Sequence, residues 1–164
     1  MHRYLLFLVA ILLLFKTGYS QKKFIPPIDY ELRSVQDLLS KWACKTYFYD
    51  EFPGEPFEQS IQVDERSKQI IYRIRDFTAG GTDTSWLATH YIPILLIDSI
   101  SQNYDDSSLT FFTPYAKIDS WQLDYPAVKN EKVSMHMQLW KVRNLSGQLW
   151  GHIRAYQLMQ KANQ

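Results

Sequence analysis

The sequence predicts an α+β domain: an N-terminal helix, a strongly bent antiparallel sheet or partly open barrel of about six to seven strands, and a C-terminal helix. Three observations lead to this fold class. Apolar residues recur with a helical period over 29–44, the period changes to two between Lys45 and about Val142, and a helical period returns over 149–162. Helices at both ends of a long run of strands are typical of an α+β architecture.

The first helix is predicted to run from Asp29, a suitable N-cap, to about Cys44. Charged and polar residues separate its apolar positions, which have the spacing of a single buried face. These apolar positions are Leu32, Val35, Leu38, Leu39 and Trp42. Residues 21–28 contain two consecutive prolines and are predicted to form an extended lead-in.

The central part of the chain reads as a meander of strands separated by turn residues. The stretch from Ile94 to Ile100 is less regular and is expected to pack across the open end of the sheet. After a turn at 144–147, one face of the last helix is expected to hold Ile153, Ala155, Leu158, Met159 and Ala162. The strand candidates are 45–52, 61–63, 70–77, 86–92, 109–113, 120–125 and 133–142.

Residues 1–20 have the pattern of an export signal: a basic start, an apolar run over 4–15, and small residues at positions 18 and 20. The apolar run has twelve residues. A helix needs roughly 20 to cross the hydrocarbon core, so we expect a signal peptide that is cleaved and no stable membrane span afterwards. The protein is therefore predicted to be periplasmic or secreted, with a single domain over 29–164.

Charge and cysteine content exclude several classes of partner and of stabilisation. Loss of residues 1–20 removes Arg3 and Lys16 and no acidic residue, which changes the formal charge from +1 to −1. A nearly neutral chain gives no reason to expect nucleic-acid binding or a polybasic membrane contact. The single cysteine cannot form an internal disulfide, so we expect stability to come from packing.

No residue pattern predicts a catalytic centre, a metal site or a cofactor. Cys44 is expected to be a buried, inert thiol, because a helix C-terminus and the nearby Trp42 both disfavour the thiolate. In the sequence 135–137, strand alternation should send both methionines to the core and His136 outward, so the three cannot share one ion. His90 and His152 lack metal-ligand spacing and are expected to be satisfied or surface histidines.

Two groups of charged residues leave alternatives open. Two of three aspartates could act as a general acid and a general base, but the distance between their carboxylates does not follow from sequence. The three are Asp98, Asp119 and Asp124. Arg73 and Arg75 share one strand face, where they either clamp an anion or form a ledge of arginine stems over the sheet. We favour the ledge.

The order of the elements resembles the PH-like fold of small exported bacterial proteins. In that fold an N-terminal helix precedes a bent sheet, a stretch like Ile92 to Ile97 follows a long strand, and a final amphipathic helix like Ile153 to Ala162 plugs the barrel. PH domains that bind phosphorylated lipids concentrate basic residues in an early hairpin. Here Arg66 and Lys68 stand among acidic residues, so the resemblance does not extend to lipid-headgroup binding.

Two functions remain open. The first, which we favour, is a non-catalytic binding or scaffold module that recognises a protein, peptide or envelope component. Its predicted contacts are the outward-facing aromatic residues Tyr47, Tyr49, Trp121 and Trp140. The alternative is a small-ligand carrier or an unrecognised hydrolase with a pocket in a lipocalin-like or other α+β cup. A cavity of several hundred Å³ that holds Asp119 or His90 beside aromatic walls would favour the alternative.

Overall fold

The computed structural model describes residues 28–48, 56–76, 86–122, 125–137 and 142–164. Within these ranges the predicted α+β fold, with a helix at each end of antiparallel strands, is confirmed. The nine strands of these ranges exceed the six to seven expected. In chain order the elements are α2 (Ile28–Trp42), β1 (Thr46–Phe48), β2 (Pro56–Asp64), β3 (Gln69–Asp76), β4 (Ala88–Pro93), the 3₁₀ helix η1 (Ile94–Leu96), β5 (Ser99–Asn103), β6 (Ser108–Phe112), β7 (Ile118–Gln122), β8 (Tyr125–Asn130), β9 (Lys132–His136) and α3 (Leu145–Ala162).

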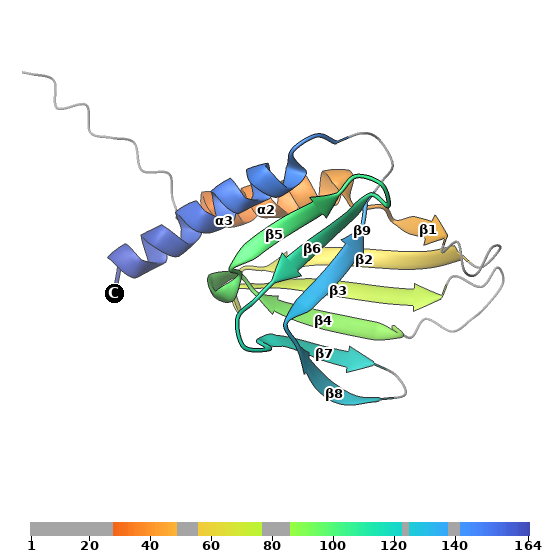
Figure 1. Ribbon diagram of the computed structural model, residues 1–164. Helices are drawn as coiled ribbons and strands as arrows, with labels where there is room; N and C mark the ends of the chain where they lie inside the picture. The colour runs from red at the N-terminus through yellow and green to blue at the C-terminus, as the bar shows by residue number, and fades with distance from the viewer. Residues whose placement is uncertain (1–27, 49–55, 77–85, 123–124, 138–141) are drawn as a thin grey trace, which may run out of the picture.

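The strands form two antiparallel sheets. The larger has the order β1-β2-β3-β4-β7-β8 and the smaller the order β5-β6-β9. Figure 1 shows the smaller sheet lying across the larger one, with α2 and α3 side by side along the same flank. No pairing within the described ranges closes a barrel, although an isolated bridge joins Ala43 to Met137 at the end of β9. This arrangement agrees with the predicted bent and partly open sheet.

One long hairpin connects the two sheets. Its first arm is β6 followed by β7, and its second arm is β8 followed by β9. The arms pair as β6 with β9 in the smaller sheet and as β7 with β8 in the larger sheet. Pairing stops where Phe112 lies opposite Lys132 and resumes where Ile118 lies opposite Asn130, so residues 113–117 stand opposite a single residue. Extra residues on one arm bend a β-ribbon sharply, as a β-bulge does. The bend of the sheet is therefore located at residues 113–117.

Two segments differ from the predicted strands. β8 was not predicted because Pro126 removes a backbone donor, which is unfavourable inside a sheet. β8 is an edge strand, where a proline is tolerated. Residues 94–96 form the 3₁₀ helix η1, and β5 begins only at Ser99.

The N-terminal helix α2 begins one residue earlier than predicted, at Ile28, and buries the predicted residues Leu32, Val35 and Leu39. Its Glu31 lies 2.6 Å from Nδ1 of His152, which links α2 to α3. The predicted signal peptide, 1–20, and the rest of the lead-in lie outside the described residues. No helix within the described ranges combines the length and apolar composition needed to span a bilayer.

The last helix, α3, begins at Leu145, four residues before the predicted start, because the preceding turn ends at Asn144 and does not extend to Gly147. Asn144 has φ 60°, in the left-handed region that asparagine tolerates better than most residues. The prediction that Leu158 shares the buried face with Ile153 was wrong, and Leu158 is exposed. It lies five residues after Ile153, which is roughly 140° around a helix. The buried residues of α3 are Leu145, Leu149, Ile153, Tyr156 and Gln157.

A single hydrophobic core joins both sheets, both α-helices and η1. Strand alternation places both methionines of 135–137 in this core, as predicted, while His136 is half-buried rather than exposed. The core residues are Leu32, Val35, Leu39, Val63, Ile70, Tyr72, Ile92, Ile94, Ile97, Leu109, Phe111, Ile118, Val133, Met135, Met137, Leu145, Leu149, Ile153 and Tyr156.

Candidate binding groove at the last helix

Of the four aromatic residues predicted to bind a partner, Trp121 is the one whose side chain the structure describes. It is 41% exposed on β7 and faces away from the core. Tyr49 and Trp140 lie outside the described residues, and for Tyr47 only the backbone position in β1 is described. Their role as contacts stays a prediction.

The outer face that carries Trp121 also carries the predicted arginine ledge. Arg73 lies opposite Thr89, which lies opposite Trp121, so the three side chains share one face of the larger sheet. The guanidinium groups of Arg73 and Arg75 lie 6.0 and 5.1 Å from the ring centre of Trp86. Arg75 also forms an ion pair with Glu58. Arg75 is thus already engaged by a carboxylate, and both guanidinium groups lie over an aromatic ring.

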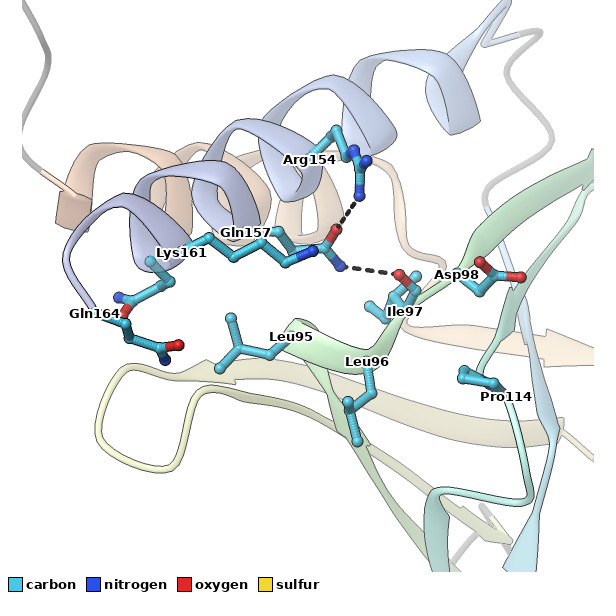
Figure 2. A pocket seen from close by; sticks show the side chains of 10 residues that line it. Leu95, Leu96, Ile97, Asp98, Pro114, Arg154, Gln157, Lys161 and Gln164 are labelled. Carbon is cyan, nitrogen blue, oxygen red and sulfur yellow. Dashed lines mark hydrogen bonds between the residues drawn. The ribbon is translucent and has the colours of Figure 1, made fainter.

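A groove of about 310 Å³ lies between the exposed sides of α3 and η1 (Figure 2). This volume is at the lower end of the roughly 300–1,000 Å³ that ligand pockets occupy. Two other hollows, of about 240 and 280 Å³, occur among the described residues, and neither of them nor the groove is lined by His90 or Asp119. The groove is lined by Leu95, Leu96, Ile97, Asp98, Pro114, Arg154, Gln157, Gln160, Lys161 and Gln164.

The η1 wall of the groove is set by the order of four apolar residues, 94–97. Residues three apart lie on the same side of a 3₁₀ turn, and here Ile94 and Ile97 are both buried in the core. Leu95 and Leu96 are therefore directed outward, and they are 42% and 43% exposed. Two large aliphatic side chains thus stand in solvent between two buried ones.

A buried glutamine of α3 holds η1 in place. Gln157 is 5% exposed, and its Nε2 donates hydrogen bonds to the carbonyl oxygens of Ile94, at 3.0 Å, and Ile97, at 2.9 Å. The Ile97 carbonyl lies just past the end of η1, where helical carbonyls lack intrahelical partners, whereas the Ile94 carbonyl also accepts the backbone N–H of Ile97 at 3.4 Å. One side chain therefore bridges both ends of η1 and connects the two walls of the groove.

The α3 wall of the groove carries two cations. Arg154 and Lys161 are seven residues apart, which is two helical turns or about 10 Å along one face. Nη1 of Arg154 donates to Oε1 of Gln157 at 3.3 Å, and Figure 2 shows the Lys161 side chain extending along α3 toward Gln157. No carboxylate of the described residues forms an ion pair with either. Asp98 lines the opposite end, beside Pro114.

The chemistry of the groove suits non-covalent binding of an anionic group joined to an apolar one. Leu95 and Leu96 offer aliphatic surface, and Arg154 and Lys161 offer donors for carboxylate or phosphate oxygens. The lining contains no serine, cysteine or histidine. Among the residues that the structure describes, no three potential ligand side chains are grouped closely enough to hold a metal ion.

His90 forms a second polar group, on the inner face of the larger sheet. Its Nδ1 lies 2.8 Å from Oγ of Ser120, and the ring stacks on Tyr72 with 5.7 Å between ring centres. Nδ2 of Asn130 donates to the same Oγ at 2.6 Å. Ser120 is only 1% exposed, so a substrate cannot reach its hydroxyl in this arrangement. His90 is a satisfied histidine, as predicted.

The free energy of unfolding is expected to decrease as the pH is lowered from about 7 to about 5. Burial is the main cause that lowers the pKa of both His90 and His136 below the usual 6.5. The unfolded histidines therefore take up protons at a higher pH than the folded ones, and acid favours the unfolded chain. Urea unfolding at both pH values measures the loss. It should be smaller in the His90→Gln variant, and equal losses would contradict the role of His90.

The other predicted residues that the structure describes occupy separate places. The prediction that Cys44 is buried was wrong: it is half-buried, because α2 ends at Trp42, and its Sγ lies 2.5 Å from the carbonyl oxygen of Thr46. Asp119 pairs with Lys129 at 3.1 Å on the surface. Asp124 lies outside the described residues. Since Asp98 lines the groove, the structure does not bring Asp98 and Asp119 to one site.

Sequence reasoning missed the groove. Leu95, Leu96, Arg154 and Lys161 belong to two segments nearly 60 residues apart, and neither segment carries a recognisable motif. The one available signal was the unusual run of four apolar residues at 94–97 directly after a strand. No protein family, curated protein or solved structure matches this chain.

Proposed function

We propose that the mature protein is an exported, non-catalytic binding module that recognises a protein, peptide or envelope component through the groove between η1 and α3. One observation carries this proposal. Two exposed leucines are held beside two cations that lack carboxylate partners in the described residues. An apolar centre with a charged rim is the usual composition of a protein contact.

The rigidity of the groove supports a binding role. Exposed leucines on a mobile loop would lose conformational entropy on binding, which weakens affinity. Here Gln157 and the buried side chains of Ile94 and Ile97 hold the two leucines in position before any partner arrives. Preorganised surfaces of this kind retain more of the free energy gained when apolar area is buried.

The sequence supports export, and the order of the elements supports a PH-like domain, which we include in the proposal. The basic start, apolar run and small residues of 1–20 are typical of a signal peptide. The order of helix, bent antiparallel sheet and final helix is the order that suggested the PH-like resemblance. A module without internal disulfides, stabilised by one continuous core, is compatible with an extracytoplasmic location.

Charge reversal in the groove, Arg154→Glu with Lys161→Glu, is expected to reduce capture of the partner by about tenfold, or about 1.4 kcal/mol. The reason is that two attractive charges at the rim become repulsive. Immobilised mature chain, residues 21–164, is incubated with native envelope extract, and the amount of each recovered component is compared between the variant and the unchanged protein.

The matched control tests the surface predicted from sequence. Trp121→Ala changes an exposed side chain on the far sheet and should leave capture within about twofold of the unchanged protein. Circular dichroism and urea unfolding show that both variants remain folded. If capture is lost in Trp121→Ala and kept in the charge-reversal variant, the groove is not the binding site.

A further inference from the structure

The two walls of the groove have different chemistry. The α3 wall presents Arg154 and Lys161, and the η1 wall presents Leu95 and Leu96 (Figure 2). In an extended peptide, successive side chains point to opposite sides. A peptide that runs along the groove would therefore present every second residue to the cations and the residues between them to the leucines.

We propose that the groove binds an extended peptide segment in which acidic and large apolar residues alternate. The acidic side chains pair with Arg154 and Lys161, and the apolar side chains pack on Leu95 and Leu96. This inference rests on the proposed function and specifies the class of ligand for the same site. Binding then depends on the order of acidic and apolar residues in the peptide as well as on their numbers.

The spacing of the groove agrees with this pattern. The Cα atoms of Arg154 and Lys161 are about 10 Å apart along α3. Residues two and four apart in an extended chain are about 7 and 13 Å apart, which brackets the spacing of the cations. Long, flexible arginine and lysine side chains absorb the difference of about 3 Å. Two acidic residues of one strand can thus reach both cations at once.

Asp98 makes the groove directional. It lies at the end beside Pro114, away from Lys161 (Figure 2). A carboxylate there repels an acidic side chain at that end of the peptide. A uniformly anionic ligand, such as a nucleic acid or an anionic membrane, would meet this repulsion and would leave the two leucines without an apolar partner. A peptide with separated charges avoids both costs.

Fluorescence anisotropy of short labelled peptides with capped ends tests the inference on the mature chain. In the first peptide glutamate and leucine alternate. The second has the same composition in two separate blocks, and in the third lysine replaces glutamate. The alternating acidic peptide should bind at least about tenfold more tightly than either control. Equal binding of the alternating and block peptides would overturn the inference.

Charge reversal of the protein provides the sharper test. In the Arg154→Glu and Lys161→Glu variant, the preference should change from the acidic to the basic alternating peptide, because only the sign of the pairing is reversed. A variant with the same change in net charge at two exposed sites that do not line the groove, Arg143→Glu with Lys45→Glu, should keep the original preference. The same loss in both variants would mean that only net charge matters, which contradicts the inference.

Two further outcomes separate this inference from the proposed function. If no peptide binds but the charge-reversal variant still loses the native partner, the groove is a binding site and the peptide class is wrong. If the variant keeps the native partner, both proposals fail. Binding to vesicles of phosphatidylglycerol, without binding to the alternating peptide, would assign the groove to a membrane surface and overturn the inference.

Discussion

Replacement of Gln157 by glutamate is expected to lower the free energy of unfolding by about 3 kcal/mol at pH 7. The Gln157 amide donates to the carbonyl oxygens of Ile94 and Ile97, and the side chain is almost fully buried. A carboxylate at this position has no proton to donate and places negative charge beside two carbonyl oxygens. Arg154, close enough to donate to the present amide oxygen, compensates only part of this cost.

The cost of Gln157→Glu should depend on pH. A buried carboxyl that faces carbonyl oxygens has a pKa raised in the folded state, because its protonated form can donate one of the lost hydrogen bonds. The penalty is then largest above the folded-state pKa and decreases as the pH falls toward the unfolded-state value. Urea unfolding at pH 7 and pH 4.5 measures the difference between the variant and the unchanged protein.

The matched control for this prediction is Gln148→Glu, on the same helix. Gln148 is exposed and lies in the first turn of α3, where a negative charge is favourable. Its free energy of unfolding should stay within about 0.5 kcal/mol of the unchanged protein. If Gln157→Glu and Gln148→Glu behave alike, Gln157 does not hold η1 against α3.

The second large effect is expected from Ile153→Ala, which should lower the free energy of unfolding by about 3 kcal/mol. Ile153 is completely buried at the centre of α3, in the core shared by both sheets and α2. Truncation removes buried methyl and methylene groups and leaves a cavity that the surrounding β-strands cannot fill by small shifts. The melting temperature should fall by several degrees, since each kcal/mol shifts it by about 2–8 °C in domains of this size.

Leu158→Ala is the control for Ile153→Ala. Both changes remove an aliphatic side chain from α3, but Leu158 is about half exposed. Alanine is also the better helix former, so the change should cost less than about 0.5 kcal/mol. Equal losses of stability in the two variants would show that helix propensity, and not burial at Ile153, determines the contribution of α3.

Much of the fold followed from local periodicity. Leu32, Val35 and Leu39 were recognised as a buried face because a helix repeats every 3.6 residues, and the structure buries all three. Alternation similarly assigned Met135 and Met137 to the core. Periodicity succeeded in these segments because each one presents one face to the core along its whole length.

Prediction failed where a neighbouring element decides the outcome. β8 contains Pro126, which disfavours a strand unless it lies at an edge, and a single segment does not reveal its place in a sheet. Leu158 fitted an apolar helical spacing with other residues of α3, but it lies roughly 140° around the helix from Ile153 and is exposed. For β8 the local pattern was compatible with two states, and tertiary contacts selected one. For Leu158 the face assigned from sequence was too wide, and the contacts of α3 with its neighbours fix the true one.

The candidate site was the least predictable part. Outward aromatic residues were predicted as contacts because strand alternation identifies exposed positions, but alternation does not show which exposed residues meet. Leu95 and Leu96 read as core residues from their composition alone. They become exposed because Ile94 and Ile97 occupy the buried side of a 3₁₀ turn that Gln157 holds from another part of the chain.

The sequence by itself determined the α+β class, the order of helix, strands and helix, and part of the core, since these depend on contacts that repeat along each segment. Only the tertiary structure decided where the ribbon bends, at residues 113–117, and which side chains face one another across the groove. The physical reason is that a groove is formed by residues distant in sequence. Its geometry depends on packing between elements, and no local pattern of apolar and polar residues encodes the distance between Arg154 and Leu95.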